Sequence, residues 1–447
     1  MSRFRRLAAL AAGCALLAAN APAAGAASGS ATTTPIKHFI YLMQGARSFD
    51  DYFGTYPGAD GFPAGECQKT GPGSGCVRPH SLDGQSTGLA GIDGPLVAAQ
   101  VDGGKMDDFV SAFEQQDRSG QTAMGYYNGS ELPTDWAAAD RYVLFDRFYS
   151  DAEFGTTANR SDWVAAADPD GNRVPAGGYG NLDTIFDRLE AAGVSWKFYV
   201  QDYNPKNTGL PVGKSANDQA ARVPLLDYAR FLDDPKLRGH IEDLSRYYAD
   251  LADGTLPAVA YVTSSGADEQ SAHSIAAGQR LIQTMVNQLM VSRYWGSSAF
   301  LWSYDQSGGW FDQQAPPNTA AGTLGLRVPA VLVSAYAKQG SIDATLSDPE
   351  SALRFIEQNW GLTPLTARDA DANSLAGAFD FAAGPRPARL LPGPATASTT
   401  VATTIPRTGT VVALYAVLVA ACVILLAVAA AAALRRNRSL AETEARP

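Results

Sequence analysis

The segment IKHFIYLMQGARSFDDYFG, residues 36–54, carries the strongest structural signal in the sequence. Residues 36–43 are apolar and rich in branched and aromatic side chains, which predicts a buried strand. The chain then enters a polar turn that contains Arg47, Asp50 and Asp51. Because ligands of open α/β sheets bind at the carboxyl ends of the strands, this turn is a candidate edge of a site. The alternative is an ordinary turn with solvated charges.

The composition indicates a folded protein with a large core. Of the 447 residues, 46% are hydrophobic and 18% are charged, which excludes a chain that is disordered as a whole. The formal net charge of -10 argues against general binding to nucleic acid, so we expect no nucleic-acid partner.

Predicted strands and helices alternate along most of the chain. Besides residues 36–43, the predicted strands are residues 142–148, 194–200, 258–263, 299–304 and 330–334. The predicted helices are residues 105–116, 135–139, 184–192, 241–252, 275–290 and 351–359, and residues 54–104 are expected to be loop-like. This alternation predicts one α/β domain, with a mostly parallel central sheet and helices on both faces.

Both ends of the chain carry segments that do not belong to this domain. Residues 1–28 combine arginines, an alanine/leucine run and small residues, which predicts a secretory signal peptide. Residues 411–434 are uncharged and apolar enough to cross a bilayer as one transmembrane helix, and arginines follow them. We therefore expect a protein of the cell membrane, with an extracytoplasmic domain over residues 35–383, a Pro/Ala/Thr-rich stalk over residues 384–410 and a cytoplasmic tail over residues 435–447.

Two of the four cysteines, Cys67 and Cys76, fall in the exported domain. Cys14 lies in the signal peptide and Cys422 in the predicted transmembrane helix. In an oxidising compartment, we expect Cys67 and Cys76 to form a disulfide across a short loop rather than a metal site.

Polar residues gather at several predicted turns. Residues 155–160, GTTANR, begin a predicted helix, where backbone N–H groups and the helix dipole favour a phosphate or an activated nucleophile, or simply a helix cap. The loops after the strands at 258–263 and 299–304 carry Glu269 and Asp305, which suit acid–base or hard-cation chemistry, or only form turns. His80 lies in a polar loop, where most histidines are surface residues.

Several segments together resemble the bacterial phosphoesterase family, which holds phosphatidylcholine-type phospholipases C and a related acid phosphatase. Between residues 35 and 381, in order along the chain, the matching segments include IKHFIYLMQGARSFDDYFG, MGYYNGSELP, TTANR, IFDRLEAAGVSWKFY, SYDQSGGWFD, RVPAVLVSAYAK and FIEQNWGLTPLTARDADAN. The resemblance implies an alkaline-phosphatase-like α/β sandwich that hydrolyses phosphate esters outside the cytoplasm.

The resemblance also implies roles for individual residues. Thr156 stands at the position of the nucleophile, which a divalent metal would activate. The other implied site residues are Asn159 and Arg160 for substrate binding, Asp305 and more weakly Asp50 for the metal, and His80, Glu269 and His273 as catalytic groups.

Many positions of the family's site are substituted. Gly45 and Ala46 replace a carboxylate and an amide that ligate metal in the family, and Gln306 replaces the second acid of an aspartate pair. Positions where the family has histidines hold Gln270, Gln313, Ala344 and Pro349. Since the loss of one transition-state donor typically lowers the rate roughly a hundred- to a thousandfold, these substitutions predict little of the parent chemistry.

Two hypotheses follow. The first is a membrane-anchored hydrolase that keeps Thr156 and Asp305, uses a divalent metal and acts on a phosphate ester or phospholipid head group. The second is a catalytically inactive pseudoenzyme without a cofactor, which serves as a cell-surface binding module for a lipid head group, a wall polymer or a protein. We therefore leave open whether the protein is an enzyme.

Overall fold

The computed structural model describes residues 31–71, 75–82, 92–212, 218–264, 275–320 and 322–394. The predicted signal peptide, transmembrane helix and cytoplasmic tail lie outside these residues, as does the stalk beyond residue 394. Within the described ranges, no helix is both long and apolar enough to cross a membrane.

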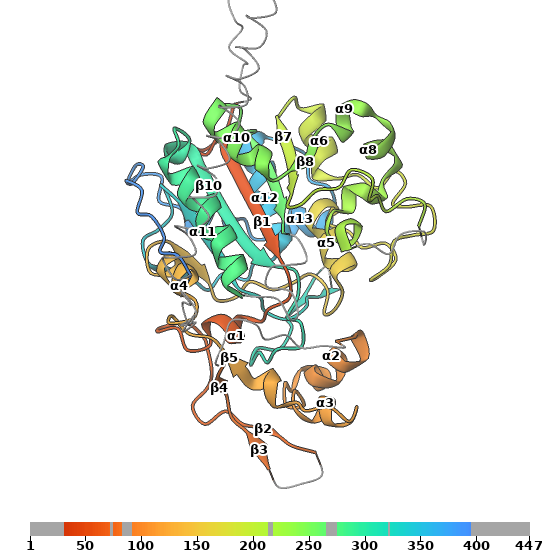
Figure 1. Cartoon of the computed structure of the whole chain (residues 1–447), viewed down its shortest axis with the longest axis vertical. Coiled ribbons are helices and arrows are strands. Elements are labelled where there is room, and N and C mark those ends of the chain that lie inside the picture. Colours follow the sequence, from red (N-terminus) through yellow and green to blue (C-terminus); the bar gives the residue numbers. More distant parts are fainter. Residues whose placement is uncertain are drawn as a thin grey trace, which may run out of the picture. The chain divides into compact units, whose positions relative to one another are not determined.

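An eight-stranded sheet forms the centre of the domain (Figure 1). Its strands, in spatial order, are β14 (Ser341–Asp343), β6 (Val143–Phe145), β13 (Ala330–Ser334), β10 (Ser298–Tyr304), β1 (His38–Gln44), β9 (Val259–Thr263), β7 (Trp196–Val200) and β8 (Ile241–Asp243). All neighbouring pairs are parallel except the two that β13 makes with β10 and β6. The predicted mostly parallel sheet is therefore confirmed.

Helices cover both faces of this sheet. One face holds α5 (Thr156–Ala165), α6 (Ile185–Ala191) and α12 (Pro349–Trp360). The opposite face holds α4 (Pro133–Ala139), α10 (Ser245–Asp253) and α11 (Ile275–Val291). The shorter helices of the domain are α7 (Asp218–Arg222), α8 (Ala229–Asp233), α9 (Pro235–Arg238) and α13 (Ala367–Asp371).

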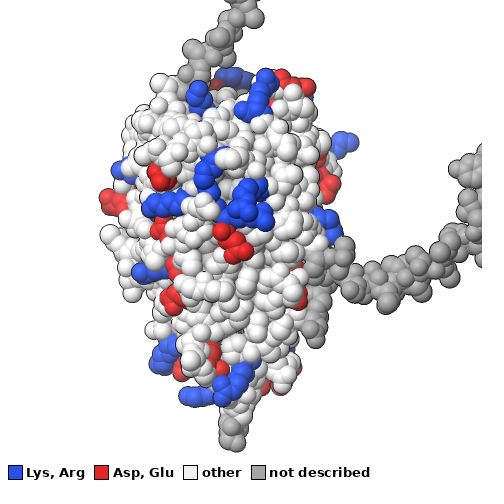
Figure 2. Space-filling view, turned by 90° about the vertical axis from the view of Figure 1, so that its left-hand side faces the viewer, with Lys and Arg blue, Asp and Glu red and all other residues white. Residues whose placement is uncertain are grey.

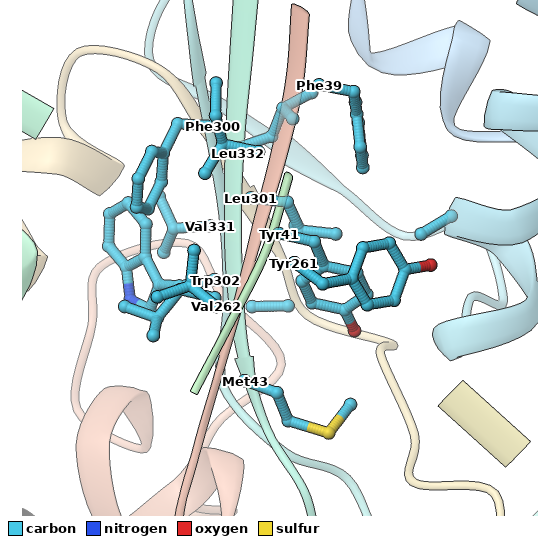
Figure 3. Packing of buried hydrophobic residues seen from close by; sticks show 14 of the residues in the cluster. Phe39, Tyr41, Met43, Tyr261, Val262, Phe300, Leu301, Trp302, Val331 and Leu332 are labelled. Atoms are coloured by element: carbon cyan, nitrogen blue, oxygen red, sulfur yellow. The ribbon is translucent and has the colours of Figure 1, made fainter. Parts of the chain in front are cut away.

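The alternation of side chains along the central strands explains this layering. On β1, Phe39 and Tyr41 point to the face of α12 and α5, where their rings contact Phe355 and Trp163. Figure 3 shows Phe300, Val331 and Trp302 on the opposite side of the strands from Phe39, Tyr41 and Tyr261. Because both faces are apolar, β1 reads in the sequence as a continuous hydrophobic run.

A smaller part of the domain follows β1 and extends beyond the carboxyl end of the sheet (Figure 1). It contains α1 (Phe49–Phe53), α2 (Gly94–Val101), α3 (Ser111–Glu114) and the short strands β2 (Gln68–Lys69), β3 (Cys76–Val77), β4 (His80–Ser81) and β5 (Gly125–Tyr126). Cys67 and Cys76 form the predicted disulfide beside β2 and β3, with their Cα atoms 5.6 Å apart.

Three predicted elements differ from the structure. The stretch expected to be a loop contains α2, because Asp93 caps its first turn and Pro95 follows. The helix expected over residues 105–116 is reduced to α3, since Met106 adopts a positive φ of 57°. Residues 241–243 form β8 rather than helix, because they pair with residues 198–200 of β7, and α10 begins only at Ser245.

Charged side chains of both signs lie on the molecular surface. On the face seen in Figure 2, Lys and Arg residues lie among Asp and Glu residues, with many uncharged residues between them. The expectation of no nucleic-acid partner stays a prediction.

Buried carboxyl groups make the stability of the domain depend on pH. Burial raises the pKa of Asp51, Asp135 and Asp227 to about 7. The folded state therefore binds more protons than the unfolded state between pH about 4 and 7, and its stability falls as the pH rises through that range. We expect urea unfolding to give a free energy at least about 2 kcal/mol lower at pH 7.5 than at pH 5. Asp135→Asn, which keeps the side-chain shape, should flatten this dependence, and a stability that increases with pH would contradict it.

Candidate functional site

The residues around Thr156 gather where three parallel strands end. Gln44 at the end of β1 lies beside Tyr304 at the end of β10, and Met43 lies beside Thr263 at the end of β9. The helix α5 begins at Thr156 and directs Arg160 toward this edge. The turn after β1 was predicted to border a site, and it does lie at the carboxyl edge of the sheet.

Gly155 gives α5 its sharp start. Its φ is 114°, and a Cβ atom there would lie 2.1 Å from Cγ of Asn172, so another residue would be strained and would clash. Asn172 Oδ1 in turn accepts the N–H of Thr157 at 3.0 Å. The start of α5 therefore fixes the position of the Thr156 hydroxyl at the edge of the sheet.

The side chain of Gln306 forms a hydrogen bond with the Thr156 hydroxyl. Its Oε1 atom accepts the N–H of Gly155 at 2.8 Å, and this bond fixes the orientation of the amide. The Nε2 atom therefore donates to Oγ1 of Thr156, at 3.2 Å. Where the family has a second carboxylate, this chain presents an N–H group to the hydroxyl.

Arg160 is fully buried and connects α5 to the strand ends. Its Nε atom pairs with Oδ2 of Asp305 at 3.1 Å. Its two terminal nitrogens donate to Thr263 Oγ1 and to the backbone oxygens of Met43, Gln44 and Arg222. These bonds use the five donors of a guanidinium group and position Arg160 at the strand ends. Its predicted role in substrate binding stays a prediction.

Asn159 is likewise committed to the protein. Its Oδ1 accepts the N–H of Ala152 at 2.8 Å, while its Nδ2 donates to the carbonyls of Ala152 and Gly155. The side chain therefore connects the preceding loop to the start of α5, and its predicted role in substrate binding stays a prediction.

Asp305 directly follows β10, and it is the predicted metal ligand that the described structure places near Thr156. Burial raises its pKa, while the charge of Arg160 and a hydrogen bond from Thr156 lower it. Asp50, the second predicted metal ligand, forms its contacts with other residues. The Asp50 carboxylate pairs with Arg327 at 3.1 Å and accepts the N–H of Gln313 at 2.9 Å, within a buried network that also contains Asp312.

The substituted positions after β1 are packed against the loop that holds Gln306. Ala46 is partly buried, and a Cβ atom on Gly308 would lie 2.6 Å from its methyl group. The N–H of Arg47 donates to the Gln306 carbonyl at 2.9 Å. Arg47 itself is buried, with its guanidinium paired to Asp51 and close to the rings of Tyr52, Tyr127 and Trp310. The charges of this turn are therefore not solvated.

The residues that the structure describes at Thr156 do not fit a divalent metal. Oxygen-preferring cations take about six oxygen ligands, several of them carboxylates. Here one carboxylate, Asp305, already pairs with a guanidinium, and the Gln306 amide turns its N–H toward the hydroxyl.

The remaining predicted catalytic residues are not assembled around Thr156 in the described structure. His80 is exposed on β4, and its Nδ1 atom lies 3.2 Å from the carbonyl oxygen of Arg78. Glu269 and His273 fall in residues 265–274, which lie outside the described ranges. Their predicted roles stay predictions.

A group of acids that the sequence did not single out could hold a metal. Asp151, Asp348 and Glu350 each offer a ligand oxygen, and these oxygens lie within 4.8 Å of one another. Asp348 caps α12, and Glu350 lies in the first turn of that helix. The sequence around Asp348 is typical of a helix N-cap, but the approach of Asp151 depends on the tertiary fold.

Comparisons with known proteins agree with the sequence resemblance. Residues 36–363 match the model of the Phosphoesterase family. The chain is 28% identical to phospholipase C A of Mycobacterium tuberculosis H37Rv, over 80% of this chain and 79% of that protein. It is 25% identical to the non-hemolytic phospholipase C of Pseudomonas aeruginosa, over 78% of this chain and 57% of that protein. Among solved structures, it is similar to an alkaline phosphatase superfamily protein from Vibrio parahaemolyticus (TM-score 0.40, 11% identity, 76% and 70% coverage).

Proposed function

Because the chain belongs to the phosphoesterase family, we propose that it is an extracytoplasmic, membrane-anchored protein that binds a phosphate ester at Thr156 and has lost metal-dependent hydrolysis. The observation that carries this proposal is the Gln306 amide, whose N–H points at the Thr156 hydroxyl. An N–H donor favours an anion at this position and disfavours a cation.

Further features of the site support an anionic ligand. The start of α5 places the positive end of a ten-residue helix beside Thr156. The charge of Asp305 is offset by Arg160, so the anion does not meet an unpaired carboxylate. The relatives are named phospholipases C, which makes a phospholipid head group or another phosphate ester the expected ligand.

The disulfide supports an oxidising location. Cys67 and Cys76 are bonded, and such bonds persist chiefly in exported domains. Together with the predicted signal peptide and transmembrane segment, this favours a domain held at the outer face of the cell membrane.

A metal-free hydrolase is the second candidate, and one contact favours it. The Thr156 hydroxyl helps to lower the pKa of Asp305, and the Oδ1 atom of this carboxylate has no hydrogen-bond donor among the described residues. The carboxylate could therefore take the hydroxyl proton while Oγ1 attacks phosphorus and the ester oxygen leaves. Without a metal or a described histidine beside the leaving group, we expect this reaction to be slow.

The two candidates can be separated with the full chain in detergent. We expect no hydrolysis of p-nitrophenyl phosphate or phosphatidylcholine above background, with or without an added divalent metal, and measurable calorimetric binding of phosphocholine. Thr156→Val should weaken this binding about five- to tenfold, since one hydrogen bond is lost. Thr157→Val, on the same turn, is the matched control and should bind as the parent does. Bound metal together with turnover that Thr156→Val abolishes would instead establish a hydrolase.

A further inference from the structure

A second group of carboxylates lies at the start of α12, in residues distinct from those around Thr156. Asp151 comes from the segment between β6 and α5, and Asp348 and Glu350 come from the beginning of α12. One oxygen from each of the three lies within 4.8 Å of the others. Segments far apart in the sequence therefore bring three acids to one point.

Asp151 is the unusual member of this group. Its side chain is 0% exposed, and neither of its carboxylate oxygens has a hydrogen-bond donor among the described residues. Burial and the neighbouring Glu350 raise its pKa well above the usual range. A buried carboxylate without donors is unfavourable unless a proton or a cation neutralises it.

Asp162, on α5, faces the same group from another element. Its side chain is 2% exposed, its Oδ1 atom has no hydrogen-bond donor among the described residues, and the charges of Glu350 and Asp348 help to raise its pKa. Four acids thus approach one another in a place that is largely shielded from water.

Arg368 is the cation that the described structure places beside these acids. It lies 3.1 Å from Glu350, 3.7 Å from an oxygen of Asp162 and 3.9 Å from an oxygen of Asp151. One positive charge cannot offset four negative ones, and an ionised group would keep a net charge of about -3 with little solvent to screen it.

A cavity gives access to this group from solvent. Its volume is about 240 Å³, and Asp348, Glu350 and Arg368 line it together with Leu324, Leu346 and Asn373. It has room for an ion with several waters, which can complete the coordination of a cation that three carboxylates hold on one side.

We propose that Asp151, Asp348 and Glu350, supported by Asp162, bind a hard divalent cation of the Ca²⁺ class. The donors are all carboxylate oxygens, which suit Ca²⁺ and do not select for zinc or copper. The ion connects the loop before α5 to the start of α12 and removes the repulsion between their acids. Its role is to stabilise the helix that carries Thr156, and it takes no part in chemistry at the hydroxyl.

The test is calcium binding by the full chain in detergent, followed by calorimetry and by the midpoint of thermal unfolding. After treatment with EDTA, we expect Ca²⁺ to bind with a dissociation constant in the range of about 0.1–1 mM, common for extracellular sites, and to raise the midpoint. Asp151→Asn should weaken calcium binding at least about thirtyfold, since it removes a charged ligand. This variant should still fold, because it also removes repulsion, and its midpoint without calcium should be no lower than that of the parent.

Two controls separate this site from other surfaces. Asp371→Asn changes an acid that lines the same cavity but lies outside the group, and it should keep the calcium response. Thr156→Val should keep it as well, because the hydroxyl is not a ligand. The proposal is overturned if the parent shows no calcium heat or shift in midpoint, which would mean that protons neutralise the group. It is also overturned if Asp151→Asn responds to calcium as the parent does.

Discussion

Arg327→Met is expected to lower the free energy of unfolding by about 3–5 kcal/mol. Arg327 is fully buried between two acids, with Nε 2.9 Å from Asp312 and a terminal nitrogen 3.1 Å from Asp50. It also donates to the carbonyls of Asp60 and Asp146 and lies over the ring of Phe49. Removing the guanidinium leaves two buried carboxylates close together without a counter-charge, and the methionine cannot satisfy them.

Denaturant unfolding of the full chain in detergent measures this loss. Arg147→Met, at an exposed arginine of the neighbouring segment, is the control and should change stability by less than about 0.5 kcal/mol. The pKa values of Asp50 and Asp312 are already raised by burial, and without Arg327 they rise further. The loss of stability should therefore be smaller at pH 5 than at pH 8. At pH 5 both acids can be protonated in the folded variant, whereas at pH 8 unfolding is favoured because it lets both carboxyl groups ionise in water.

A triple variant tests the physical cause. Adding Asp50→Asn and Asp312→Asn to Arg327→Met should recover a good part of the lost stability, because the uncompensated charges are gone. If Arg327→Met alone costs less than about 1 kcal/mol, the network is not a stabilising unit of the fold.

The sequence predicted the sheet because the strands are buried on both faces. Runs such as residues 36–43 and 299–304 are continuous and apolar, so they stand out without any knowledge of their partners. Short edge strands such as β8 and β14 are three residues long and half-buried, and they depend on a neighbour for their hydrogen bonds. Local pattern does not reveal them.

The candidate site was predicted in part, for a similar reason. The family resemblance located Thr156 and Asp305, and in the structure the Thr156 hydroxyl helps to lower the pKa of Asp305. The same resemblance suggested Asp50 as a weak metal ligand, yet this acid forms an ion pair with Arg327, which lies far away in the sequence. Likewise, the approach of Asp151 to Glu350 follows from the packing of α12 beside α5 and leaves no spacing signal in the sequence. Ion pairs between distant segments are decided by the tertiary fold.

The proposed loss of metal chemistry depends on single positions, because the residues around them keep their structural roles. Gly155, Asn159 and Arg160 still shape the start of α5 and its link to the strand ends. The difference lies in the group beside the Thr156 hydroxyl. Gln306 contributes a neutral hydrogen-bond donor, whereas a carboxylate would contribute a negatively charged acceptor. Changing this residue should therefore change which ion the site accepts.

Gln306→Asp is expected to weaken the binding of phosphocholine about a hundred- to a thousandfold in the presence of EDTA. A carboxylate about 4 Å from the bound phosphate adds a repulsion of roughly 4 kcal/mol at an effective dielectric constant near 20, and the donated hydrogen bond is lost as well. A divalent cation should restore part of the binding, because Asp305 and the new carboxylate together offer it two charged oxygens.

Gln306→Asn is the control, since it shortens the side chain by the same amount but stays neutral. It should lose about tenfold in affinity or less, and added Mn²⁺ or Mg²⁺ should not change it. Calorimetry with phosphocholine, with and without the cation, compares the two variants directly. If the aspartate and asparagine variants bind alike under EDTA, the charge at this position does not govern the ligand, and the assignment of Thr156 and Gln306 to an anion site fails.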